Sequence, residues 1–486
     1  MIVLWLLLAL PVAGGVVAAM IPSPRAVLLL CVIGALAEVV LAALVVPAAL
    51  DAPVFAGGRQ LMLDALSAYH LGLVVVVFAF SSVFALRYFG PLVQDGTFSR
   101  GTARRFGAAW FGFLASMVMV LLANNVGLLW VAMETTTLAS ALLVCLEFDP
   151  PSVKASWTYM MICSVGIALA LLGTFLLCGE ARNVTTGTES PFLWTDLVRA
   201  APRMRPGGVK LAFLFLLVGY GTKAGLAPMH TWLPDAHGQA PTPVSAVLSG
   251  VLLNCAMYAI SRFVPVVDAV TGGDGWASTL LVPFGLVSIL VAVAFIAHER
   301  DLKRLLAYCS IEHTGIIALA LGLGAMPAAL FHTLGHSIAK MVAFFSVGFL
   351  ARQHGTRDSQ AISGMLRVSP LAGMGLLLAV LALAGAPPFS LFMSELWVAI
   401  EGVEQGHTAV VVAFLLGVAV IAVVLLRPVL GMVWRPVAKG GRAAGLGWID
   451  WLLVAAPLAV LGLLGLWMPA LLTDALNKAA AILRGG

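Results

Sequence analysis

Apolar stretches about as long as a bilayer is thick follow one another along the whole chain, with short polar segments between them. A helix needs about 20 mostly apolar residues to cross a membrane. By that measure the sequence predicts about fourteen spans, at 2–21, 25–47, 64–86, 106–123, 126–146, 155–178, 211–230, 243–261, 276–297, 302–322, 326–351, 368–400, 409–433 and 450–473. The first has no positively charged segment before it, and a second span follows at once, so we expect a membrane helix there rather than a signal peptide. The pattern predicts an all-α polytopic membrane protein.

The composition supports this class and limits the chemistry. Of 486 residues, 61% are hydrophobic and 10% are charged, whereas soluble domains are about 45–50% apolar and about 25% charged. This excludes a soluble enzyme, and no basic run is dense enough to follow a nucleic-acid backbone. The six cysteines are scattered, without the close spacing of zinc, haem or iron–sulfur ligands, and there is no phosphate-binding glycine loop. We therefore expect no metal, no cofactor and no redox site of its own, so that partners would supply any redox chemistry.

Basic residues in the connecting segments predict the orientation. Most of them follow the odd-numbered spans, among them Lys303 and the pair Lys439 and Arg442, while Arg262 falls in a segment on the other side. Loops rich in lysine and arginine stay on the cytoplasmic side. We expect a multi-pass protein of the cell inner (plasma) membrane with both termini on the outer, periplasmic side.

Six charged residues lie inside the predicted spans: Glu38, Glu134, Lys223, Glu312, Lys340 and Glu395. Each would cost about 2.5–3.5 kcal/mol if it faced lipid, so we expect them to face the bundle interior, paired or hydrated. Burial favours the neutral form of a lysine, and a nearby carboxylate favours the charged form. Movement of Glu134 toward or away from Lys223 would therefore load or release a proton. The alternative is a set of static ion pairs, and for Glu38 we expect a structural role.

Glycines and prolines interrupt two of the spans. Lys223 lies in the interrupted run 219–228, and Glu395 follows the interrupted run 384–389. Interior prolines free backbone carbonyls that lipid cannot satisfy, so such breaks survive beside protein or a wet cavity. Paired interruptions in corresponding spans are typical of inverted-repeat transporters. We expect two five-helix repeats, in which Glu134 corresponds to Glu312 and Lys223 to Glu395.

These repeats divide the chain into four parts. We expect three N-terminal helices at 1–105, the first repeat at 106–265, the second repeat at 266–435, and a last helix with its tail at 436–486.

Histidines supply groups that titrate near neutral pH. His332, His336 and Lys340 are spaced by four residues and so share one stripe of the span 326–351. Such a pair of histidines also suits zinc, but no HExxH motif and no third ligand accompanies it, so we expect a proton relay. His313 directly follows Glu312 and should point to a different face, where a relay role and a packing role are equally open. His70 is expected at the interface, without a role.

Two runs of sequence resemble a known family. The run 223–250 (KAGLAPMHTWLPDAHGQAPTPVSAVLSG) resembles the signature of the antiporter-like membrane subunits of respiratory complex I, Mrp-type sodium/proton antiporters and membrane-bound hydrogenases, and the likeness covers roughly residues 60–435. The run 301–315 (DLKRLLAYCSIEHTG) is most similar to the F subunits of hydrogenase-4 and formate hydrogenlyase. The resemblance implies fourteen helices in two inverted repeats, with the seventh and twelfth broken. It also implies that Glu134 and Lys223 form the key acid–lysine pair, with His332, His336, Lys340 and Glu395 toward the exit.

The residues and the resemblance together predict a proton-translocating membrane subunit of a redox-driven hydrogenase or complex I-like NADH/quinone oxidoreductase. Its partners would be other membrane subunits of the same complex, and its relay would use Glu134, Lys223, Glu312, His313, His332, His336, Lys340 and Glu395. The alternatives are a sodium/proton antiporter subunit of the Mrp type and a passive scaffold, which would have no need of six mid-span charges. Asn254 stands where the family often has lysine or histidine, and an amide cannot titrate, so water or another group must link the two halves.

Overall fold

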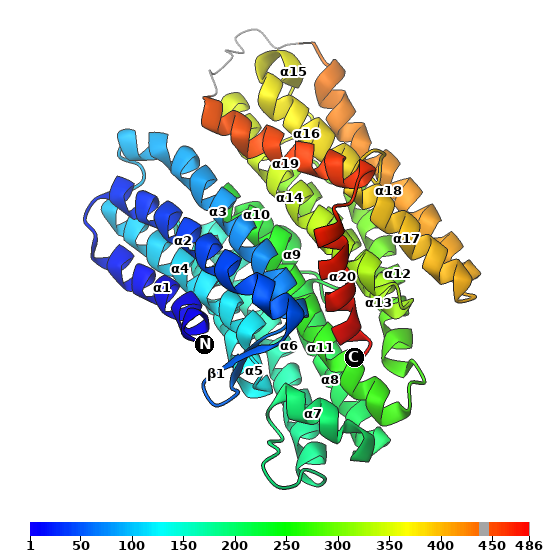
Figure 1. The fold of residues 1–486 in the computed structure, drawn as a ribbon. Helices are drawn as coiled ribbons and strands as arrows, with labels where there is room; N and C mark the ends of the chain where they lie inside the picture. Colours follow the sequence, from blue (N-terminus) through cyan, green and yellow to red (C-terminus); the bar gives the residue numbers. More distant parts are fainter. Residues whose placement is uncertain (437–446, 486) are drawn as a thin grey trace.

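The computed structural model describes residues 1–436 and 447–485, which form a tilted bundle of helices (Figure 1). Within this described part, twelve helices are long and apolar enough to cross a membrane. They are α1 (Ile2–Met20), α2 (Pro24–Asp51), α3 (Ala65–Gln94), α4 (Arg100–Leu122), α5 (Val126–Val144), α6 (Pro150–Arg182), the continuous segment Thr242–Thr271, α12 (Trp276–Ile296), α13 (Leu302–Gly322), α14 (Met326–His354), α18 (Thr408–Trp434) and α19 (Trp448–Leu466). The predicted all-α polytopic fold is confirmed.

The segment Thr242–Thr271 is built from three pieces, and shorter elements complete the chain. The pieces are α10 (Thr242–Val247), a π-helical turn η2 (Leu248–Leu252) and α11 (Leu253–Thr271). The remaining helical elements are α7 (Trp194–Ala200), the 3-10 turn η1 (Ala201–Arg203), α8 (Pro206–Ala224), α9 (Leu233–Gln239), α15 (Met365–Val368), α16 (Pro370–Leu383), α17 (Ser390–Glu404) and α20 (Ala470–Leu483). The strands β1 (Val54–Ala56) and β2 (Leu61–Leu63) pair antiparallel in a small hairpin between α2 and α3.

Two of the predicted spans do not form one continuous helix. The span 211–230 covers most of α8 and the connection to α9, because α8 ends at Ala224. Gly225 follows with a φ of 75°, a left-handed conformation that glycine adopts without steric cost. The span 368–400 is divided between α16, which ends at Leu383, and α17, which begins at Ser390. Since the spans that meet the length and hydropathy requirement number twelve in the described residues, the count of fourteen stays a prediction.

Side-chain caps fix where the helices that carry the central charges begin. Asn125 accepts hydrogen bonds from the amides of Gly127 and Leu128 at the start of α5. Asp301 does the same for the amides of Lys303 and Arg304 at the start of α13. These caps satisfy amides that have no partner within the helix. They fix the residue at which each helix begins, and with it the positions of Glu134 on α5 and Glu312 on α13.

Glycines allow the closest helix contacts. A Cβ on Gly219 of α8 would lie 2.6 Å from the Cβ of Ala170 on α6, and one on Gly285 of α12 would lie 2.6 Å from the carbonyl oxygen of Gly315 on α13. Small residues let membrane helices pack at short distance, where van der Waals contact replaces the missing hydrophobic drive. The α6–α8 and α12–α13 contacts therefore hold α8 and α13 in fixed positions beside the interior.

The structure corrects three assignments from the sequence. Arg262 was expected in a loop, but α11 continues past it, and its guanidinium is buried against the Asp64 carboxylate at 2.5 and 2.6 Å. Lys303 was also counted as a loop residue, but it is buried and donates to the carbonyls of Gly238 and Ala240. His70 is buried rather than interfacial, with Nδ1 donating to the Leu66 carbonyl at 2.9 Å. A polar partner inside the protein compensates each of these groups.

The predicted orientation of the chain depends in part on two basic residues near the end of the sequence. Lys439 and Arg442 lie outside the described residues. Arg262 and Lys303 are buried. The predicted orientation of the chain therefore depends on fewer exposed basic residues than the sequence suggested.

Candidate functional site

The six mid-span charges lie in the interior of the bundle on six different helices. Glu38 is on α2, Glu134 on α5, Lys223 on α8, Glu312 on α13, Lys340 on α14 and Glu395 on α17. Glu134 is half-buried, and the other five have at most 6% of their surface exposed. In the described part of the chain, none of the six lies within 4.0 Å of an opposite charge. The alternative of static ion pairs therefore does not describe this arrangement.

Lys223 lies in the last turn of α8, next to the interruption of the helix. Its Nζ donates to Thr137 Oγ1 at 2.9 Å and to Tyr159 OH at 2.6 Å. The Tyr159 hydroxyl lies in turn 2.7 Å from Ser140 Oγ. A cation in the last turn is also favoured by the negative end of the helix dipole. Neutral hydroxyls from α5 and α6 thus hold the ammonium group in place of a carboxylate.

Glu134 lies one turn before Thr137 on α5 and binds to α6. Its Oε1 accepts a hydrogen bond from Ser164 Oγ at 2.7 Å, while Oε2 has no hydrogen-bond partner among the described residues. The acid–lysine pair that the resemblance implies is therefore not a direct contact. Thr137, one turn after Glu134 on α5, contacts Lys223 instead of Glu134.

A cluster of histidines joins α13, α14 and α17. His313 Nδ1 lies 2.9 Å from His332 Nε2, and His332 Nδ1 lies 2.9 Å from Ser394 Oγ. The ring of His336 is centred 5.0 Å from that of His313, and neither of its nitrogens has a hydrogen-bond partner in the described part of the chain. His313, whose role was open between relay and packing, thus lies at the centre of this group.

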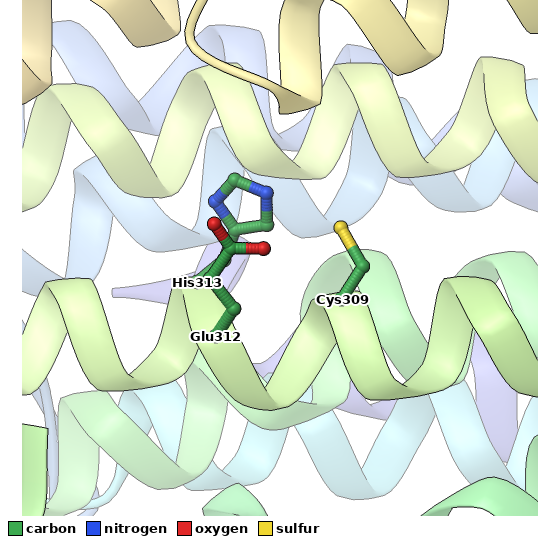
Figure 2. Close-up of side chains that lie close together, drawn as sticks. All are labelled: Cys309, Glu312 and His313. Atoms are coloured by element: carbon green, nitrogen blue, oxygen red, sulfur yellow. The ribbon is translucent and has the colours of Figure 1, made fainter. Parts of the chain in front are cut away.

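Glu312 and His313 come closer to each other than successive positions on a helix suggest. Figure 2 shows Cys309, Glu312 and His313 together on α13, and an atom of the Cys309 thiol, the Glu312 carboxylate and the His313 ring all lie within 4.8 Å of one another. The expectation that His313 points away from Glu312 is wrong, because both side chains bend toward the same interior space. Within the described residues, both oxygens of Glu312 lack a hydrogen-bond partner.

Glu395 lies against the interruption between α16 and α17. Its Oε2 occupies the place where a Cβ on Gly385 would be, 2.2 Å from that position, and Gly385 has a φ of 63°. Its Oε1 has no hydrogen-bond partner in the residues that the structure describes. Atoms of Glu395, His313 and His332 lie within 4.8 Å of one another, so the histidine cluster reaches this carboxylate.

Lys340 lies one turn after Ser337 on α14, and Asn254 contacts the same stretch of α14 from α11. Lys340 Nζ donates to the Leu306 carbonyl at 2.7 Å. Asn254 Nδ2 donates to the Gly250 carbonyl at 2.7 Å and to Ser337 Oγ at 2.8 Å. Because η2 precedes α11, the Gly250 carbonyl is free to accept from side chains, as happens at π-helical turns near functional sites. Asn254 is thus linked to α14 next to His336, but it offers no titratable group.

The distances in the histidine cluster suit a hydrogen bond better than a metal ion. Two nitrogens bound to one tetrahedral zinc ion lie about 3.3–3.4 Å apart, since each Zn–N bond is about 2.0–2.1 Å. His313 and His332 lie 2.9 Å apart, which is a hydrogen-bond distance. Although His313, His332 and Glu395 could offer three ligands, the geometry indicates a shared proton.

Comparison with known proteins places the fold. The family described as "NADH:quinone oxidoreductase/Mrp antiporter, TM" matches residues 123–421. The chain belongs to this family. The resemblance that the sequence runs suggested is confirmed, and the chain is a multi-pass, antiporter-like membrane protein.

Two of the bacterial relatives are named as hydrogenase-4 components. A hydrogenase-4 component F homolog of Methylacidiphilum infernorum is 40% identical over 341 residues, which cover 70% of this chain and 71% of the relative. Hydrogenase-4 component B of Escherichia coli K12 is 30% identical over 349 residues, and the chain spans half the length of that relative.

Solved structures show the same fold over nearly the whole chain. A chain of the Mrp complex from Dietzia has a TM-score of 0.84 at 22% identity and covers 99% of this chain and 97% of its own length. A chain of respiratory complex I from Thermus thermophilus has a TM-score of 0.78 at 25% identity, with 97% and 98% covered.

The region that defines the antiporter family contains every residue of the candidate relay, from Glu134 to Glu395. Glu38 lies outside it. The hydroxyl groups of Thr137, Tyr159, Ser164 and Ser394 were not singled out from the sequence, because serine, threonine and tyrosine carry no charge that would mark them as costly in a membrane helix.

Proposed function

We propose that the chain is a proton-translocating membrane subunit of a hydrogenase-type or complex I-like assembly, and that protons move laterally through its interior. The observation that supports this most is the row of titratable side chains on α5, α8, α13, α14 and α17, which are buried or half-buried and have no ionic partner among the described residues. Charged groups in a membrane interior are costly and mark ion pathways. The relay would consist of Glu134, Lys223, Glu312, His313, His332, His336, Lys340 and Glu395.

The proposed relay has two ends, and at the first, which contains Glu134 and Lys223, hydroxyl groups contact both titratable side chains. At that end the two groups bind different hydroxyls, since Glu134 accepts from Ser164 on α6 while Lys223 donates to Thr137 on α5 and Tyr159 on α6. At the other end the histidines connect α13 with the carboxylate of Glu395 on α17. Redox chemistry in partner subunits would drive the transfer, because the cysteines in the sequence are not spaced as iron–sulfur ligands are.

The remaining parts of the proposal concern assembly and orientation. Hydrogenase-4 subunits are among the relatives, and the solved neighbours are parts of multisubunit complexes, so we infer that other membrane subunits of one complex are the partners. The distribution of basic residues supports a plasma-membrane location with both termini on the outer side. We further propose the four parts 1–105, 106–265, 266–435 and 436–486, with one interrupted helix in each central part.

A sodium/proton antiporter subunit is the alternative. Sodium is a hard cation that prefers oxygen ligands, whereas the carboxylates of Glu312 and Glu395 are surrounded by histidine nitrogens and the Cys309 sulfur. This donor set favours protons. Replacing sodium by choline in the assay below separates the two functions, since a sodium antiporter would stop and a proton relay would continue.

The test is proton uptake by inside-out membrane vesicles that contain the whole complex. Glu134→Gln should leave the complex assembled but abolish most proton translocation, because the amide cannot change charge beside Lys223. Glu38→Gln is the matched control, since Glu38 is also a mid-span glutamate inside the bundle but lies outside the family region. Undiminished proton uptake in an assembled Glu134→Gln complex would contradict the proposal.

A further inference from the structure

A chain of hydrogen bonds runs from His313 through His332 to Ser394 and ends at a backbone carbonyl. His313 Nδ1 lies 2.9 Å from His332 Nε2, and His332 Nδ1 lies 2.9 Å from Ser394 Oγ. Ser394 Oγ lies 2.8 Å from the carbonyl oxygen of Leu391, one turn earlier on α17. All three side chains are fully buried. The Leu391 carbonyl, at the end of this series of hydrogen bonds, determines which atoms carry the hydrogens.

A carbonyl oxygen only accepts, and a serine hydroxyl has one hydrogen to donate. If that hydrogen pointed to His332, the lone pairs of two oxygens would face each other at 2.8 Å. Ser394 therefore donates to Leu391 and accepts from His332 Nδ1–H. A neutral histidine carries one ring hydrogen, so His332 Nε2 has none.

The same argument extends to the next ring. Because His332 Nε2 has no hydrogen, it accepts from His313 Nδ1–H across the 2.9 Å contact. His313 then has no hydrogen on Nε2. That atom has no hydrogen-bond partner in the described residues, so its lone pair is open to an arriving proton.

We propose that Ser394 is a positioning residue that holds His332 in the Nδ1–H tautomer, so that His332 takes up and releases protons at Nε2 alone. This inference rests on the proposed relay and adds a direction to it. It also assigns a role to a neutral residue that neither the family likeness nor the charge pattern marks.

The transfer balances in protons and needs no electrons. A proton binds His313 Nε2, the Nδ1 proton of His313 moves to His332 Nε2, and His313 is left neutral with its hydrogen on Nε2. His332 now carries both hydrogens. His332 cannot pass a proton on through Ser394, because the serine hydroxyl would then have to give its own proton to the Leu391 carbonyl. That carbonyl has no proton to release and would become charged if it took one up. The proton leaves from Nε2, and the Glu395 carboxylate, within 4.8 Å of both rings, is a base within reach.

A serine that bonds a carbonyl one turn back is also an ordinary helix feature. If Ser394 had that role alone, its loss would leave the His332 tautomer unchanged. The tautomer is therefore the measurement that separates a positioning residue from a structural one.

The experiment uses the complete complex in lipid bilayers with ¹⁵N-labelled histidine. Solid-state NMR distinguishes a protonated ring nitrogen from a bare one, and the signal of His332 is assigned from its loss in His332→Asn. We expect His332 Nδ1–H in the native protein and an approximately fivefold loss of that preference in Ser394→Ala, the factor for one hydrogen bond of about 1 kcal/mol. Ser394→Thr, which keeps the hydroxyl, should restore it.

Ser390→Ala is the matched control. Ser390 is buried on the same helix, and its hydroxyl has no hydrogen-bond partner among the described residues, so the variant should not change the His332 signal. A native His332 with its hydrogen on Nε2, or a tautomer that is the same in Ser394→Ala as in the native protein, would overturn the inference.

Proton translocation gives the second readout. Ser394→Ala should slow proton uptake about fivefold in assembled complexes, and Ser394→Thr should restore it. If Ser394→Ala shifts the tautomer while both it and His332→Asn translocate normally, the tautomer assignment stands and the proposed relay through His332 fails. If His332→Asn stops translocation but Ser394→Ala shifts neither the tautomer nor the rate, the relay stands and the role of Ser394 fails.

Discussion

Gly385 controls where the Glu395 carboxylate lies, and Gly385→Ala tests this directly. The Cβ introduced by the substitution would lie 2.2 Å from Glu395 Oε2 and 3.0 Å from the carboxyl carbon. Ordinary contact begins at about 3.4 Å, so the oxygen must move by roughly 1 Å. The clash involves the end of a flexible side chain, and we therefore expect the carboxylate to move while the backbone stays in place.

A displacement of that size matters because proton transfer needs hydrogen-bond contact. Misplacing a reacting group by about 1 Å can reduce a rate by about a hundredfold, and we expect Gly385→Ala to reduce proton translocation at least tenfold. Alanine also pays for the positive φ at this position, at a cost of about 1–2 kcal/mol of stability.

Gly406→Ala separates these two effects. Gly406 has a φ of 83° in the turn between α17 and α18, and a Cβ there would meet no atom within 4 Å. It should lose the same stability as Gly385→Ala, measured as thermal unfolding of the purified complex, while keeping its proton uptake in vesicles. Equal translocation by the two variants would refute the reasoning. If Gly385→Ala fails to assemble, Glu395→Asp moves the carboxylate without a backbone change and should show the same loss.

Four further substitutions test the middle of the bundle and the buried pair of Asp64 and Arg262. His336→Ala should strongly reduce proton uptake. Asn254→Lys should keep or increase proton uptake, because a lysine can still donate to the Gly250 carbonyl and Ser337 Oγ. An inactive Asn254→Lys complex together with unchanged proton uptake in His336→Ala would exclude this lateral route. Asp64→Asn keeps the helix cap of α3 but removes the partner of buried Arg262, and it should cost about 3–5 kcal/mol of unfolding free energy. Asp51→Asn, which breaks the exposed pair with Lys478, should leave the melting temperature unchanged, and equal stability of both aspartate variants would contradict the argument.

The membrane class could be predicted from the sequence because it depends on costs that are visible in single residues, and the family could be predicted because the runs 223–250 and 301–315 resemble its members. Long apolar runs have no other solvent than lipid, and a charge within them needs a compensating environment. The same reasoning selected Lys223 and Glu312, which the structure buries. The contacts of these groups could not be predicted, since a buried ammonium can donate to any nearby hydroxyl, and Thr137 and Tyr159 are not distinguishable in sequence from other threonines and tyrosines.

Charges near the ends of spans were harder to predict than those in the middle. Arg262 directly follows the span expected at 243–261, and helix length alone does not show that α11 continues to Thr271. Its burial depends on Asp64, which is 198 positions away in the sequence. Lys303 likewise depends on the carbonyls at the end of α9, a helix whose place is fixed by the interruption after Lys223. Such pairs follow from the packing of distant helices and carry no local signal.

The lack of ion pairs among the mid-span charges has a physical consequence for the proposed relay. Two opposite charges buried side by side stabilise each other strongly at low dielectric, and breaking such a pair costs about 3–5 kcal/mol. A proton that had to cross such a pair at each step would be slowed by that cost. Hydroxyl groups contact Lys223 and one oxygen of Glu134 without fixing their charge, because a hydroxyl can accept from an ammonium and donate to a carboxylate. The charge of Lys223 then depends on whether Glu134 is ionised nearby, which is the sensitivity that a relay requires and that a closed salt bridge such as Asp64–Arg262 lacks.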